Sequence, residues 1–90
     1  MPNTHKTIQL ILRKYGVAHA SLFGSFAANA QTTASDIDII IRPPESMGLE
    51  FVALQQELES ATGRQVDLVS FNGVSDYFME SIKPTLKPLL

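Results

Sequence analysis

Apolar residues follow a helical spacing in two segments of the chain. The first set is Ile8, Ile11, Leu12 and Tyr15. The second set is Met47, Phe51, Leu54, Leu58 and Ala61. Both sets repeat at steps of three and four residues, which is typical of an amphipathic helix with one buried face. Gly16 and Gly63 follow the two sets as left-handed exits, and Ser46 is the expected N-cap of the second helix.

Three shorter segments have the character of strands, at residues 17–23, 36–41 and 65–70. The middle one has four isoleucines in six residues and is predicted to be a central strand buried on both faces. A short helix is expected over 26–31, and a last helix from a Ser75 cap to Lys83-Pro84.

This order of elements predicts a small α/β sheet covered by helices, and the pattern leaves open whether the sheet is parallel or mixed. The apolar segment 84–90, which contains two prolines, has two interpretations. It covers an edge of the sheet or docks on a partner.

Composition narrows the class of protein further. The chain has 90 residues, no cysteine, no tryptophan and a formal net charge of −2, so we expect one domain over residues 1–90. Without cysteine there is no disulfide and no thiolate metal site. The near-neutral charge argues against a surface that grips long nucleic acid. No apolar run is long enough to span a membrane and the start lacks a signal peptide, so the expected location is the cytoplasm.

Gly24-Ser25 ends the first strand and precedes a segment that favours helix. Glycine allows a close backbone approach, and free N–H groups at the start of a helix bind phosphate. Taken alone, the pair favours a plain structural turn, because Gly-Ser occurs in loops of many kinds.

Two aspartates stand at the head of the most apolar strand. Asp36 and Asp38 are two residues apart, so their side chains leave the same face about 6–7 Å apart. Two like charges on one face repel each other, whereas Mg²⁺ prefers such hard oxygen ligands. The alternative is that both acids lie in an exposed first turn of the strand without a function.

A third aspartate favours the metal site. Asp67 lies between Val66 and Leu68 and faces away from them. If its strand neighbours the one that carries Asp38, the three carboxylates converge on a site for two metal ions about 3.5–4 Å apart. The fourth aspartate, Asp76, has the pattern of ordinary surface.

Taken together, Gly24-Ser25, Asp36-Ile37-Asp38 and Val66-Asp67-Leu68 resemble the signature of the DNA polymerase β-type nucleotidyltransferase superfamily. Ten residues separate Ser25 from Asp36, and twenty-eight separate Asp38 from Asp67. The small size is similar to the minimal nucleotidyltransferases. The resemblance implies an α+β fold like the polymerase β palm, with a small mixed sheet flanked by helices.

The resemblance also assigns roles to the residues that match. It implies that Asp36, Asp38 and Asp67 bind two Mg²⁺ ions, and that Gly24 and Ser25 hold the phosphates of ATP. One departure is Ala28-Asn29, where the family typically has Arg-Gly. Two arginines elsewhere are candidate substitutes for the missing guanidinium, namely Arg42 and Arg64.

The leading hypothesis is a Mg²⁺-dependent nucleotidyltransferase that transfers AMP from ATP to an acceptor hydroxyl. By resemblance, the acceptor is a tyrosine of a small helical HEPN-type toxin, and the protein is its antitoxin. The alternative is a catalytically weak or inactive module that neutralises the partner by masking it, which the absence of an arginine at Ala28 favours. A small-molecule acceptor is a further hypothesis.

Overall fold

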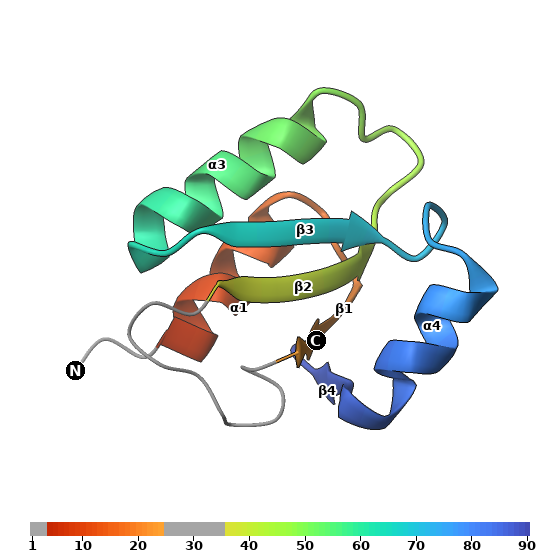
Figure 1. Cartoon of the computed structure of the whole chain (residues 1–90). Helices are drawn as coiled ribbons and strands as arrows, with labels where there is room; N and C mark the ends of the chain where they lie inside the picture. The colour runs from red at the N-terminus through yellow and green to blue at the C-terminus, as the bar shows by residue number, and fades with distance from the viewer. Residues whose placement is uncertain (1–3, 25–35) are drawn as a thin grey trace.

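The computed structural model describes residues 4–24 and 36–90, and Figure 1 labels its elements. The helices are α1 (Thr4–Lys14), α3 (Glu50–Thr62) and α4 (Asp76–Ile82), with a short 3₁₀ helix η1 (Lys83–Thr85). The strands are β1 (His19–Phe23), β2 (Ile37–Arg42), β3 (Val66–Ser70) and β4 (Lys87–Pro88). The helix expected over 26–31 lies outside the described residues. Among those residues, no helix is long and apolar enough to cross a membrane.

The four strands form one mixed sheet in the order β3-β2-β1-β4. β2 and β3 are parallel, whereas β1 is antiparallel to both β2 and β4. The pattern left the choice between parallel and mixed open, and the structure confirms the mixed sheet that the resemblance implied. β4 was not predicted. Of the two interpretations of 84–90, the structure supports the first, because this segment pairs with β1 and Leu89 N–H donates to the Ala20 carbonyl at 2.8 Å.

Each face of the sheet packs against different helices (Figure 1). α1 and α3 cover one face, where the side chains of Ile37, Ile39 and Ile41 are fully buried. α4 covers part of the other face, against Phe23 and Ile40. The prediction that residues 36–41 form a central strand buried on both faces is therefore confirmed, since β2 lies inside the sheet.

The predicted strands 36–41 and 65–70 differ from β2 and β3 by one residue, whereas the starts of α3 and β1 differ from the predictions by more. α3 begins at Glu50 instead of Met47, and its N-cap is Leu49, so Ser46 is not the cap. Gly48 separates Met47 from the helix, and its N–H donates to the Glu50 carboxylate at 2.8 Å. β1 begins at His19 instead of residue 17, because the N–H of Val17 still bonds the Leu12 carbonyl in the turn that ends α1.

The other predicted helix ends are confirmed. Gly16 and Gly63 both have left-handed φ angles, of 80° and 69°. Ser75 is the N-cap of α4, and its hydroxyl accepts the Phe78 N–H at 3.1 Å. These local signals therefore position the helices that cover the sheet.

Leu58 of α3 should be among the costliest side chains to truncate. It is 0% exposed and belongs to the core between α3 and the sheet. We expect Leu58→Ala to lower the free energy of unfolding by about 2–5 kcal/mol, because it removes buried methyl groups and leaves a cavity. Urea denaturation measures this value. The control is Val52→Ala in the same helix, where the side chain is 54% exposed and the expected change is within about 0.5 kcal/mol. Equal losses in the two variants would contradict this packing.

Candidate active site

The candidate site forms where three strands meet at one end of the sheet. The end of β1 lies beside the start of β2, since Phe23 and Asp38 are register partners. The start of β3 lies on the other side of β2, since Asp38 and Asp67 are register partners in the parallel pair. Neighbouring strands are about 4.8 Å apart, so the two aspartates are close neighbours. The predicted convergence of the carboxylates required that the two strands are adjacent and share a face. The structure confirms this condition.

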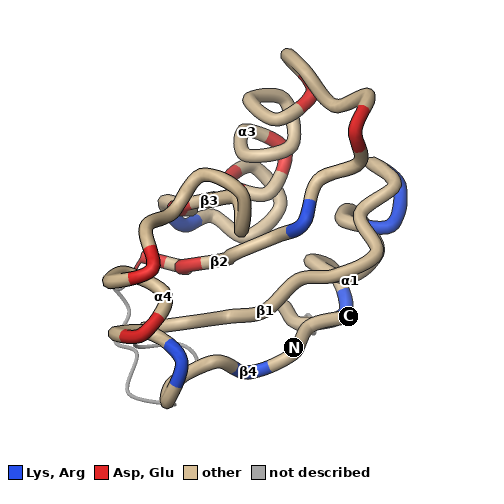
Figure 2. Tube along the Cα trace, turned by 90° about the vertical axis from the view of Figure 1, so that its right-hand side faces the viewer, with Lys and Arg blue, Asp and Glu red and all other residues tan. Residues whose placement is uncertain are grey.

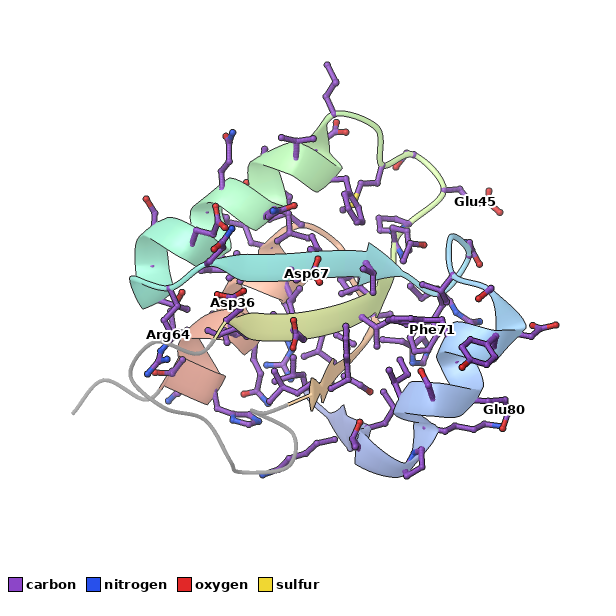
Figure 3. All side chains as sticks on the ribbon, in the orientation of Figure 1. Asp36, Glu45, Arg64, Asp67, Phe71 and Glu80 are labelled. Carbon is purple, nitrogen blue, oxygen red and sulfur yellow. The ribbon has the colours of Figure 1, made fainter. Side chains whose placement is uncertain are left out.

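The side chains of Asp38 and Asp67 project from the face of the sheet that α4 covers in part. Ile37, Ile39 and Leu68 belong to the core on the opposite face, and successive side chains alternate along a strand. Asp36 precedes β2 and is exposed. Figure 3 shows Asp36 at the start of β2, on the side of the sheet away from α4, and Asp67 on the neighbouring β3.

Gly24 packs directly against the Asp38 carboxylate. Its φ angle is +71°, and an added Cβ would lie 2.4 Å from the Asp38 Oδ2 and 3.4 Å from its Cγ. A side chain at this position would both strain the backbone and displace the carboxylate. The sequence suggested a phosphate-binding role for Gly24, and the structure adds that only glycine leaves room for Asp38. Ser25 and Ala28-Asn29 lie outside the described residues.

The three aspartates influence one another electrostatically. Burial raises the pKa of Asp38 above its ordinary value, and the negative charges of Asp67 and Asp36 raise it further. Like charges disfavour the ionised form, whereas a bound cation would favour it. The site therefore has an excess of negative charge that a divalent cation would offset.

These carboxylates suit Mg²⁺ by their chemistry, because Mg²⁺ takes hard oxygen ligands and keeps waters and substrate phosphates in its remaining positions. Within residues 4–24 and 36–90, no three His, Asp or Glu side chains are gathered closely enough to hold one ion as they stand. A single ion would thus be held by two carboxylates at most, with rotation of the exposed Asp36 or Asp67 side chain needed for a third. The assignment of Asp36, Asp38 and Asp67 as metal ligands stays a prediction.

The structure separates the two arginines considered as substitutes for the one missing at Ala28. Arg42 is the last residue of β2, at the opposite end of the strand from Asp38, and lies over the Phe71 ring. It is therefore too far away to act at the aspartates, and this candidate was wrong. Arg64 directly precedes Gln65, whose carbonyl accepts the Ile37 N–H at 2.9 Å. Arg64 therefore lies at the same end of the sheet as Asp36 (Figure 3).

Asp38→Asn should stabilise the fold when no metal is present. The folded-state pKa of Asp38 lies above its ordinary value of 3.8, so the favourable contribution of its protonated form is present below that value. The contribution is lost as the pH rises through the raised pKa. Asparagine keeps the shape and never ionises, so we expect a higher Tm for Asp38→Asn than for wild type at pH 7 in EDTA. Differential scanning calorimetry measures the difference. Millimolar Mg²⁺ should raise the Tm of wild type more than that of the variant. A larger rise in the variant would contradict the charge repulsion.

Sequence comparison places the chain in a class. The family described as “Polymerase beta, Nucleotidyltransferase” matches residues 6–90. The chain therefore belongs to the polymerase β-type nucleotidyltransferases, as the motifs predicted. Among its relatives is the Methanocaldococcus jannaschii protein named “Putative protein adenylyltransferase MJ0435”. The two are 41% identical over 73 residues, which are 80% of this chain and 78% of the relative.

Solved structures share the fold over almost the whole chain. A structure described as a toxin-antitoxin with AMP-PNP matches with a TM-score of 0.82 and 29% identity, over 99% of this chain and 73% of that one. A second complex is described as the tri-AMPylated Shewanella oneidensis HEPN toxin with its MNT antitoxin. It matches with a TM-score of 0.76 and 26% identity, over 97% of this chain and 69% of that one. The four-stranded mixed sheet with its helices is thus the nucleotidyltransferase fold.

Proposed function

We propose that this nucleotidyltransferase transfers AMP from ATP to a hydroxyl group of a HEPN-type toxin and thereby acts as its antitoxin. The observation that carries the proposal is the alignment of Asp38 with Asp67 across β2 and β3, beside Asp36 and Gly24. Carboxylates so placed offer hard ligands for metal ions that clamp an in-line phosphoryl displacement.

The comparisons support three components of the proposal. The name of the M. jannaschii relative supports a protein as the acceptor. The matching complex with AMP-PNP supports an adenine nucleotide as the substrate. The AMPylated toxin in the other complex supports a HEPN-type partner.

In the proposed reaction, the acceptor oxygen attacks the α-phosphorus of ATP, the bond from that phosphorus to the bridging oxygen breaks, and pyrophosphate leaves. Asp36 and Asp38 would hold two Mg²⁺ ions with Asp67 as the third ligand, and Asp67 accepts the proton of the hydroxyl. Bound Mg²⁺ would neutralise the charge that develops on the phosphates. Gly24, together with Ser25, holds the β- and γ-phosphates through backbone N–H groups.

Nucleotide binding can be tested without any partner. We expect isothermal titration calorimetry to show AMP-PNP binding that requires Mg²⁺ and is lost in Asp38→Asn. Asp76→Asn is the matched control, since it removes an exposed carboxylate at the start of α4, away from the three strand ends. Binding of equal strength in EDTA would contradict the metal requirement.

Masking of the partner is the second candidate, and the residue Ala28 in place of arginine favours it. The variant with alanine at Asp36, Asp38 and Asp67 separates the two functions. If the protein acts by transferring AMP, this variant should still bind the toxin but should no longer protect the growth of cells that express the toxin. Retained protection would favour masking.

A further inference from the structure

A pocket lies at the end of the sheet opposite the aspartates. Its volume is about 320 Å³, and it lies between the start of β1, the end of β2, the segment after β3 and the C-terminal residues. Figure 3 shows Phe71 of this pocket far along the sheet from Asp36. Nothing in the proposed transfer of AMP uses it.

The strand register sets two nitrogen-bearing side chains next to each other in this pocket. His19 and Arg42 are register partners across β1 and β2, and partner side chains have Cβ atoms about 4.5–5.5 Å apart. Arg42 is two residues after Ile40 in β2, so both side chains leave the face that carries α4. Histidine has an N–H donor in either protonation state, and arginine has five. The Ser21 hydroxyl lines the same pocket.

The Phe71 ring lies beside the guanidinium of Arg42. The Phe71 N–H donates to the Ile41 carbonyl at 2.9 Å, which continues the pairing of β2 with the chain beyond β3. The guanidinium carbon lies 6.0 Å from the centre of the Phe71 ring. At this distance the cation is weakly attracted to the face of the ring. The planar guanidinium carries five N–H donors in a fork that matches a carboxylate or phosphate group.

Within the described residues, Arg42 is in neither of the ion pairs found. None of the side chains that line the pocket is acidic. Two ion pairs among the described residues join Lys14 to Glu57 and Lys83 to Glu80. Figure 2 shows that charge is separated along β2, with acidic positions at its start and a basic position at its end.

We propose that this pocket binds an oxyanion, a carboxylate or a phosphate group, between Arg42, His19 and Ser21. Arg42 supplies a bidentate, charge-assisted contact, and the other two donate single hydrogen bonds. Pro88 and Leu90 form an apolar wall for the carbon part of the ligand. Because Arg42 is four residues from Asp38 along an extended strand, about 13 Å, this site is separate from the metal site.

Solution NMR on the whole chain tests the proposal with sodium acetate and sodium phosphate as probes, each compared with sodium chloride at equal ionic strength. We expect saturable shifts of the Arg42 side-chain Nε–H and of the backbone amides of His19 and Ser21. The probe that saturates at the lower concentration identifies the preferred group as carboxylate or phosphate. Arg42→Gln should weaken the affinity roughly tenfold or more, because a charge-assisted bond is lost.

The control is Lys87→Gln, which removes the same charge from neighbouring β4 but not from the pocket lining, and which should leave the affinity unchanged. Shifts that are no larger than those with chloride would overturn the proposal. So would shifts that survive in Arg42→Gln or that fall equally in Lys87→Gln. None of these outcomes depends on transfer of AMP, so the test stands apart from the proposed function.

Discussion

Asp38→Asn is expected to lower the rate of AMP transfer about 10³-fold, because it removes the carboxylate that lies between the other two aspartates. Asp38 is the register partner of Asp67 on one side and of Phe23 on the other, so no other carboxylate can take its position. Asp67→Asn should have a similar effect. Single-turnover transfer of label from α-³²P-ATP to the partner measures both rates.

Two controls make this result specific to the site. Asp76→Asn changes a carboxylate of the same type on the exposed first turn of α4 and should keep the rate of wild type. The Tm of Asp38→Asn in EDTA should not fall below that of wild type, which excludes unfolding as the cause. Loss of transfer in Asp76→Asn, or wild-type transfer in Asp38→Asn, would contradict the assignment.

Gly24→Ala is expected to lower the transfer rate about 10²-fold, because a misplacement of the reacting groups by about 1 Å has an effect of that size. The new Cβ would lie 2.4 Å from Oδ2 of Asp38, so the carboxylate must move. Alanine at a left-handed φ also costs about 1–2 kcal/mol of stability. Transfer kinetics and urea denaturation measure the two effects separately.

Gly63→Ala is a close control for this variant. The φ angle of Gly63 is +69°, against +71° for Gly24, but an added Cβ there would meet nothing within 4 Å. Both variants should therefore lose stability through backbone strain, and only Gly24→Ala should lose transfer activity. Equal activity in the two variants would show that the contact with Asp38 has no catalytic importance.

Much of the fold follows from local signals in the sequence. The isoleucines of 37–41 indicated a strand buried on both faces, since β-branched residues pack well in a pleated sheet. Ser75, Gly16 and Gly63 act through the backbone of their own turn, so the sequence revealed these helix ends without knowledge of the rest of the chain.

The features that the sequence did not reveal depend on contacts between distant residues. β4 has only two residues, one of them proline, so it carries no strand pattern, and it forms because β1 presents an open edge. The start of α3 predicted from the sequence is too early, because Met47 shares the helical spacing but Gly48 separates it from the helix.

The candidate site likewise combines features that local sequence indicates with features that depend on contacts between distant residues. The spacing of Asp36 and Asp38 indicated a shared face, but the pairing of β2 with β3 that places Asp67 beside Asp38 could only be assumed. The exclusion of Arg42 needed the length and direction of β2, because nearness in sequence says little about distance along an extended strand. The contact of Gly24 with Asp38 joins two strands and has no local signature.

The central claim is the proposed transfer of AMP to a protein hydroxyl, and intact-mass spectrometry of the proposed HEPN-type partner tests it most directly. After incubation with this protein, ATP and Mg²⁺, the partner should gain the mass of one AMP for each modified hydroxyl. It should gain none in EDTA or with Asp38→Asn. No added mass with the wild-type protein, while the partner is bound and neutralised, would contradict the account.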